Sequence, residues 1–102
     1  MKPTKEQIGK LLVWCGFEYR FVDTWLYPDG SYGSIPDIDS LEFLGFLFKY
    51  AMELVRVKIG DVKFAILMRR WVRQLFLGED PVLALFWVLD KIREENDVSK
   101  VS

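Results

Sequence analysis

The sequence predicts a single small domain of the α+β class, a layered α/β sandwich in which a sheet of two to four strands packs with about four helices. Three observations predict it. Apolar residues recur with helical spacing in four stretches, they alternate with a period of two in one or two others, and the length of 102 residues suits one domain. We expect residues 1–95 to form the domain and residues 96–102 to form a flexible tail.

The first helix is predicted over residues 4–15. Thr4 and Gln7 stand three positions apart, which is the spacing of a capping box, and Gly16 provides a stop. The apolar residues between them recur three and four positions apart: Ile8, Leu11, Leu12 and Cys15.

A strand is predicted from Phe17 to Tyr27, because aromatic and polar residues alternate there with a period of two. The segment Pro28-Asp29-Gly30 then has the residues of a tight turn, in which Gly30 takes a positive φ. A short returning segment over residues 31–35 completes the hairpin.

The second helix is predicted over about 40–54, with Asp39 as N-cap and Glu42 three positions later. It is apolar nearly all round, so we expect it to be buried on more than one face. The five residues 55–59 alternate between apolar and basic, which predicts a strand ending at Gly60. A helix that continues to Gly60 is the alternative.

The clearest helical stripe lies in residues 62–77, with Asp61 as N-cap. Its apolar face consists of Phe64, Leu67, Met68, Trp71, Val72, Leu75 and Phe76. The alternative for residues 62–66 is a hairpin strand that pairs back through Gly60 and Asp61. Asp80 as N-cap and Pro81 as first residue open the last helix, over about 81–95.

Three short motifs resemble the phage ABA sandwich domain family, found in phages and prophages. They are the Trp strand and turn over residues 25–30, the Ser-Leu-Glu helix start over residues 36–43, and Asp-Pro-Val-Leu-Ala-Leu over residues 80–85. The resemblance implies a sheet layered with helices and a viral or prophage origin, and it implies no activity. The chain departs from the family pattern at residues 64–76, where a strand pair is expected and this sequence has a helical stripe.

Composition argues for an intracellular protein that associates with itself. Apolar residues make up 51% of the chain and aromatic residues 16%, a large apolar load for a small body. We therefore expect a two-fold homodimer. The net charge of −1 gives no general attraction to nucleic acid or membranes, and the longest apolar run, residues 81–89, is too short to span a bilayer. Cys15 is the only cysteine and the N-terminus has no signal-peptide pattern, so we expect a reducing, cytoplasmic location.

The chain contains no histidine, which excludes Ser-His-Asp and Cys-His nucleophiles and nearly all types of zinc site. We expect no enzyme activity, no cofactor and no metal. Asp37 and Asp39, with Asp23 or Asp29, are the residues that would bind Mg²⁺ or Ca²⁺. The simpler interpretation gives these carboxylates local roles in a turn and a helix start.

Two sets of residues are candidates for binding a partner. Residues 56–73 carry six bases and one acid, so their basic side would accept phosphates or an acidic protein surface; the candidates are Arg56, Lys58, Lys63, Arg70 and Arg73. A solvated outer face is the alternative. Trp25, Tyr27 and Tyr32 would form a stacking platform, against the alternative of core packing.

The sequence therefore favours a small interaction protein of phage or prophage type that acts by protein contact. The alternative function is a protein that binds or sequesters a small anionic ligand such as a nucleotide. A carboxylate-dependent enzyme is the third and least favoured class.

Overall fold

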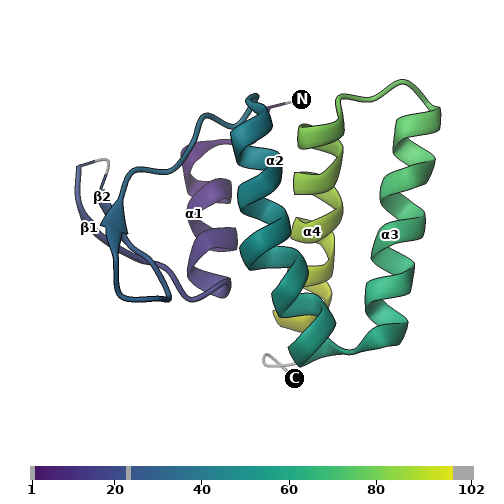
Figure 1. Ribbon diagram of the computed structural model, residues 1–102. Coiled ribbons are helices and arrows are strands. Elements are labelled where there is room, and N and C mark those ends of the chain that lie inside the picture. Colours follow the sequence, from purple (N-terminus) through teal and green to yellow (C-terminus); the bar gives the residue numbers. More distant parts are fainter. Residues whose placement is uncertain (1, 23, 98–102) are drawn as a thin grey trace.

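The computed structural model describes residues 2–22 and 24–97, and within them the predicted α+β class is confirmed (Figure 1). Three antiparallel strands lie at one side of four helices, with α3 at the opposite edge. The elements are α1 (Lys5–Trp14), β1 (Glu18–Phe21), β2 (Thr24–Leu26), β3 (Tyr32–Gly33), α2 (Leu41–Leu47) with its continuations η1 (Phe48–Met52) and η2 (Val55–Ile59), α3 (Asp61–Phe76) and α4 (Pro81–Asp97).

The first helix matches its prediction. The Thr4 side chain accepts a hydrogen bond from the Gln7 backbone N–H at 3.1 Å, and the Gln7 side chain accepts one from the Thr4 N–H at 2.8 Å. This capping box satisfies two amide donors at the start of α1. The helix ends before Gly16, whose φ of 98° is accessible to glycine at little cost.

The predicted strand from Phe17 to Tyr27 is two strands. The chain turns back after Phe21, so that Tyr19 pairs with Trp25 and β1 lies antiparallel to β2. The sequence signal for this turn is the break in alternation at residues 22–23, which the prediction of one strand passed over because the alternation resumes at Trp25 and Tyr27. The second turn is as predicted: Gly30 has a φ of 92° and donates its N–H to the Tyr27 carbonyl at 3.0 Å.

The strand predicted over residues 55–59 is wrong, and its helical alternative is correct. Helix α2 continues through two wide π-helical turns, η1 and η2, to Ile59. Val55 is fully buried and Val57 is exposed, whereas alternation would have placed them on the same face. Val55 and Ile59 are four residues apart and share the inner helical face. The burial of these side chains therefore follows the helical period and not the period of a strand.

Two of the predicted N-caps are displaced by one residue. Ser40, not Asp39, caps α2 and accepts a hydrogen bond from the Phe43 N–H at 3.2 Å. Gly60, with a φ of 118°, precedes α3, so Asp61 is the first helical residue. The carboxylate of Asp61 lies in the first turn, where the helix dipole favours negative charge.

Helices α3 and α4 form a hairpin, and both agree with their predicted positions. The Asp80 carboxylate accepts hydrogen bonds from the N–H groups of Val82 at 2.9 Å and Leu83 at 3.1 Å, so it is the N-cap of α4. The alternative of a strand at residues 62–66 is excluded, because α3 is continuous from Asp61. Helix α4 runs to Asp97, two residues past the predicted domain boundary, and the remainder of the predicted tail lies outside the described residues.

The core is centred on α4, which contacts α1, α2 and α3. Its most buried residues are Leu85, Phe86, Leu89 and Ile92. The sheet joins this core through Phe17. The centroid of the Phe17 ring lies 4.8 Å from the ring centroid of Tyr27, 5.1 Å from that of Phe46 and 5.0 Å from that of Tyr50. Edge-on contacts of this kind add to the stabilisation from buried area. None of the helices in the described ranges is long and apolar enough to cross a membrane.

Candidate interaction surfaces

The structure divides the five basic candidates between two elements. Arg56 and Lys58 are exposed on η2, not on a strand, and Arg56 pairs with Glu53 with an Nη2–Oε1 distance of 2.6 Å. Lys63, Arg70 and Arg73 lie on α3, while Leu67 is fully buried and Trp71 and Leu75 are half-buried. The inward positions of Leu67, Trp71 and Leu75 agree with the prediction, whereas Val72 and Phe76, predicted on the same apolar face, are exposed.

Arg70 and Arg73 line a groove between α3 and α4 with a volume of about 610 Å³, which we call the α3–α4 groove. Helix α4 contributes Trp87 and Lys91 to it, and sequence reasoning did not single out either residue as a basic-site partner. The remaining lining residues are Gln74, Leu77, Glu79, Leu83, Ala84 and Val88. Lys91 follows Trp87 by four positions, a spacing that could have signalled a shared face of the helix.

Positive charge dominates this groove. It is lined by three cationic side chains and one carboxylate, that of Glu79. Arg70 reaches Glu95 at 3.4 Å, and both side chains remain more than a third exposed, so this pair is weak. Within the described part of the chain, Arg73 and Lys91 form no ion pair.

A second surface on α3 is apolar. A smaller groove of about 230 Å³ lies between η1 and α3 and is lined by Phe48, Met52, Phe64 and Met68, with Glu53 and Arg56 also at its edge. The Phe48 ring stands edge-on to Trp71 at 5.4 Å. Along α3, the row of residues four positions apart continues from Met68 to Val72 and Phe76. We call these residues the apolar strip: Phe48, Met52, Phe64, Met68, Val72 and Phe76.

Three of the six residues of the strip are exposed, whereas Met52 is buried and Phe64 and Met68 are half-buried. Phe76 is 87% exposed and Val72 is 40% exposed, and Phe48 is also exposed. Of the sixteen residues of α3, only Leu67 is classed as buried. Trp71 contributes to local structure, because its indole N–H donates to the Pro81 carbonyl at 2.9 Å and ties α3 to the start of α4.

The three aromatic candidates do not form a platform. In the β2–β3 pair, Trp25 stands opposite Gly33 and Leu26 stands opposite Tyr32, so Tyr32 lies on the other face of the ribbon from Trp25. Tyr27 packs against Phe17, and its hydroxyl donates to the Ser34 carbonyl at 2.7 Å. Burial raises the pKa of Tyr27. Of the three residues, only Tyr32 is exposed.

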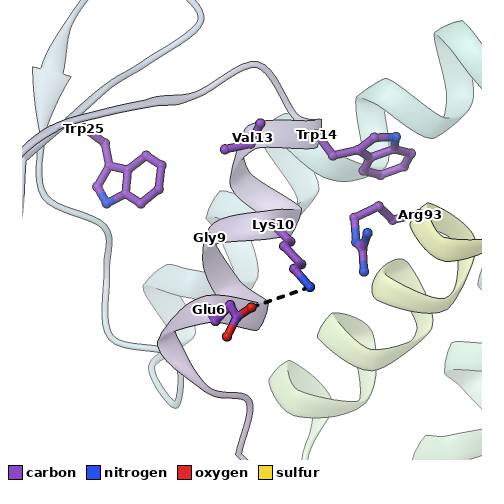
Figure 2. Close-up of a pocket in the computed structure, with 7 residues that line it drawn as sticks. All are labelled: Glu6, Gly9, Lys10, Val13, Trp14, Trp25 and Arg93. Atoms are coloured by element: carbon purple, nitrogen blue, oxygen red, sulfur yellow. Dashed lines mark ion pairs between the residues drawn. The ribbon is translucent and has the colours of Figure 1, made fainter. Parts of the chain in front are cut away.

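Trp25 instead lines a hollow of about 750 Å³ beside α1, shown in Figure 2. The Trp25 ring packs over Gly9 of α1, and a Cβ at that position would lie 3.9 Å from the ring, at ordinary van der Waals distance. The charges of the hollow are matched: Glu6 pairs with Lys10 at 3.7 Å, and Arg93 pairs with Asp90. The hollow therefore offers less unbalanced charge to a ligand than the α3–α4 groove.

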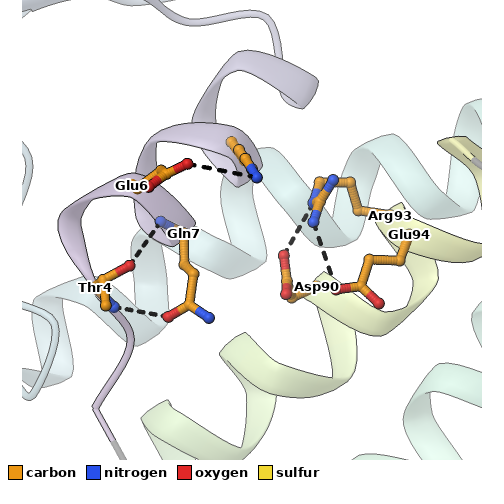
Figure 3. Close-up of polar contacts among 7 residues, drawn as sticks. Thr4, Glu6, Gln7, Asp90, Arg93 and Glu94 are labelled. Carbon is orange, nitrogen blue, oxygen red and sulfur yellow. Dashed lines mark hydrogen bonds and ion pairs between the residues drawn. The ribbon is translucent and has the colours of Figure 1, made fainter.

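The Asp90–Arg93 pair is a feature that sequence reasoning missed (Figure 3). The Asp90 carboxylate accepts a hydrogen bond from Arg93 Nε at 2.9 Å, and Asp90 is only 5% exposed. The signal for it was an acid and a base three positions apart in an apolar helix, which places them on one face.

The acidic candidates have local partners. The Asp29 carboxylate accepts hydrogen bonds from the Ser31 hydroxyl and N–H, which lower the pKa of Asp29. Asp39 pairs with Lys2 at 2.9 Å, and that hydrogen bond lowers its pKa. Asp37 is exposed, its backbone carbonyl accepts from Ser40, and Asp23 lies outside the described residues. Among residues 2–22 and 24–97, no three acidic, cysteine or histidine side chains are grouped as a metal site would require.

No protein-family model, no curated protein and no solved structure matches this chain, so the resemblance to the phage ABA sandwich domain family stays a prediction.

Proposed function

We propose that the chain is a non-enzymatic interaction protein that acts by protein contact, and that its contact surface is the apolar strip. The observation that carries the proposal is the exposure of Phe76 and Val72 beside the groove formed by Phe48 and Met68. Exposed apolar side chains in a contiguous row are typical of protein interfaces, whereas isolated ones are common on any surface.

A second copy of the chain is the partner that the strip fits best. Around a two-fold axis, the strips of two copies lie against each other, so each apolar side chain is covered by another. The edge of the groove carries one acid and one base, Glu53 and Arg56. These two charges pair with each other within the chain at 2.6 Å, so the edge of the groove brings no unpaired charge against a second copy. Helix α3, with 16 residues, is about 24 Å long and offers a contact along its whole length.

The absence of histidine from the sequence supports a non-enzymatic role. So does the state of Cys15, because burial raises the pKa of its thiol to about 12 and keeps it protonated at neutral pH. The resemblance to the phage family favours an accessory protein of a phage or prophage.

Sedimentation velocity at tens of micromolar tests the proposal, comparing the wild-type chain with Phe76→Ser and Phe21→Ser. We expect the 12.0 kDa wild-type chain to sediment as a dimer. Phe76→Ser should raise the dissociation constant roughly 10-fold or more, because the burial of a phenylalanine side chain contributes about 1.5–3 kcal/mol.

Phe21→Ser is the matched control, since Phe21 is 68% exposed on β1, far along the chain from the strip. It should leave the dimer intact, and circular dichroism should show that both variants fold. A monomeric wild-type chain, or dissociation by Phe21→Ser and not by Phe76→Ser, would contradict the proposed surface.

A further inference from the structure

The α3–α4 groove is distinct from the apolar strip, because the two lie on opposite flanks of α3. On a helical wheel, Met68 and Val72 fall on one side of the buried Leu67–Trp71 face, and Arg70 and Arg73 fall on the other side. The strip and the groove therefore share no lining residue, and they come nearest to each other where Phe76 stands three positions from Arg73.

The groove is polarised along its length. Helices α3 and α4 run antiparallel and are joined by a short loop, as Figure 1 shows, so residues near the loop on one helix face residues near the loop on the other. Leu77 and Leu83 therefore lie near the loop end, and Arg70 and Lys91 lie at the other end. The contact of Arg70 with Glu95 fits this register. Arg73 and Trp87 lie between the two ends.

We infer that the α3–α4 groove binds a small phosphorylated ligand that also carries a planar aromatic ring. A guanidinium group can donate two parallel hydrogen bonds to the oxygens of one phosphate. Arg73 and Lys91 have no ion-pair partner among the described residues that would compete with a phosphate for their N–H groups. Trp87 and Leu83 both line the groove and contribute apolar side-chain surface for the ring. The volume of about 610 Å³ lies in the range of small-molecule sites.

The same observations disfavour a long nucleic acid. The net charge of the chain is −1, so its overall field does not attract a polyanion. Positive charge in the groove comes from Arg70, Arg73 and Lys91, which can neutralise one phosphate group or a short chain of them. A small ligand that carries both a phosphate and a ring matches a lining in which these cations lie beside Trp87 and Leu83.

Isothermal titration calorimetry at low ionic strength tests the inference with three probes: ATP, tripolyphosphate and adenosine. We expect ATP to bind more tightly than either of the others, because it alone has both parts. Trp87→Leu should weaken the binding of ATP and leave that of tripolyphosphate nearly unchanged. Binding of tripolyphosphate and ATP with equal affinity would refute the role of Trp87, and the absence of binding by all three probes would refute the site.

Arg73→Glu and Arg69→Glu form the matched pair of variants. Both residues are exposed on α3 and both substitutions change the charge equally, but only Arg73 lines the groove. Loss of a charge-assisted contact to phosphate predicts a decrease in ATP affinity of about 10-fold or more for Arg73→Glu. Arg69→Glu should change the affinity by less than about 3-fold, and equal effects of the two would mean that only the overall charge matters.

The inference is separable from the proposed contact function. The titration of Phe76→Ser with ATP should give the affinity of the wild-type chain, because Phe76 does not line the groove. If Phe76→Ser abolishes both self-association and ATP binding while the chain remains folded, the groove is complete only in the dimer, and the site as described here is wrong.

Discussion

At the scale of single residues, the Asp90 carboxylate is the charged group most fully removed from solvent among the described side chains. A buried charge is stable only if it is paired, and Arg93, whose side chain is 11% exposed, pairs with Asp90 through its Nε atom. The pair lies on the side of α4 that faces α1 (Figure 3). We infer that it fixes how these two helices meet, since either charge alone would be poorly solvated there.

Asp90→Ala should lower the free energy of unfolding by about 1.5–3 kcal/mol, because it removes the charge-assisted hydrogen bond that the buried Asp90 carboxylate accepts from Arg93 Nε. Urea unfolding measures this change. Glu94→Ala is the control, since Glu94 is exposed and its contact with Arg93, at 3.8 Å, is weak. The double variant Asp90→Leu with Arg93→Met should recover most of the loss, and a double variant as unstable as Asp90→Ala would show that the charges themselves stabilise the fold.

The Cys15 thiol should react very slowly in the folded protein. Burial raises its pKa from an ordinary value of 9.0 to about 12, so only roughly one molecule in ten thousand carries a thiolate at pH 8. A chromogenic disulfide reagent measures the rate, and the chain unfolded in guanidinium chloride is the fast reference. A folded chain that reacts as fast as the unfolded chain would contradict the burial of the thiol.

The same shift makes stability depend on alkaline pH. Because the unfolded thiol ionises near pH 9 and the folded thiol near pH 12, the contribution of Cys15 is fully present below pH 9 and is lost as the pH rises through 12. The free energy of unfolding should therefore fall less steeply over this window in Cys15→Ala than in the wild-type chain. Identical slopes would show that the pKa of Cys15 is not raised.

At the scale of elements, the helix over residues 41–59 shows where sequence patterns stop being informative. Five alternating residues fit a strand and also fit a helix whose inner face is Val55 and Ile59, and only the burial of Val55 against the core separates the two. The segment is itself a π-helical turn, η2, and it follows the π-helical turn η1 in the same continuous helix. The 16 residues of α3 and the capped start of α1 were predictable because their patterns are long or specific.

The residues of the α3–α4 groove were predictable only in part, because a local pattern does not show which helix packs beside which. Arg70 and Arg73 stand out in sequence because they interrupt an apolar helix on one side. Trp87 and Lys91 do not, because a tryptophan in a buried helix is indistinguishable from core until the neighbouring helix is placed beside it. The separation of Tyr32 from Trp25 likewise depends on the register of β2 and β3, which no local pattern encodes.

Alanine substitutions at Gly45, within α2, and at Gly60, after η2, should have opposite effects on stability. Gly60→Ala should lower the free energy of unfolding by about 1 kcal/mol or more, because the φ of 118° strains any residue with a Cβ. Gly45→Ala should raise it by roughly 0.5–1 kcal/mol, because Gly45 lies within α2 and a Cβ there meets nothing within 4 Å. Thermal unfolding measures both, and a loss of stability in Gly45→Ala would contradict the helical assignment of α2.

At the scale of the whole molecule, the fold consists of a helical core and a sheet attached at its side (Figure 1). All four residues of β1 are exposed, and β3 has only two residues. The sheet is held to the helices mainly by the ring of Phe17 and the side chain of Tyr27. Helix α4 is enclosed by the other three helices, with Leu85, Leu89 and Ile92 fully buried. Local opening should therefore begin in the sheet.

Hydrogen exchange should separate the two parts. We expect the amides of β1 and β2 to exchange through a local opening whose free energy lies below that of global unfolding and depends little on urea, because the opening exposes little buried surface. The buried amides of α4 should exchange only through global unfolding and should depend strongly on urea. Equal protection and equal urea dependence in the strands and in α4 would show instead that the molecule opens as one unit.

Tyr27→Phe tests whether the hairpin opens by itself. The substitution removes the hydrogen bond from the Tyr27 hydroxyl to the Ser34 carbonyl and keeps the ring against Phe17. It should lower the free energy of opening of the β2–β3 amides by about 1 kcal/mol, the contribution of a typical hydrogen bond. The amides of α4 should change less than those of the strands, because a bond lost within the opening segment weakens that segment first. If the strands keep their protection and α4 loses it, then Tyr27 stabilises the core rather than the hairpin, and the division into core and attached sheet is wrong.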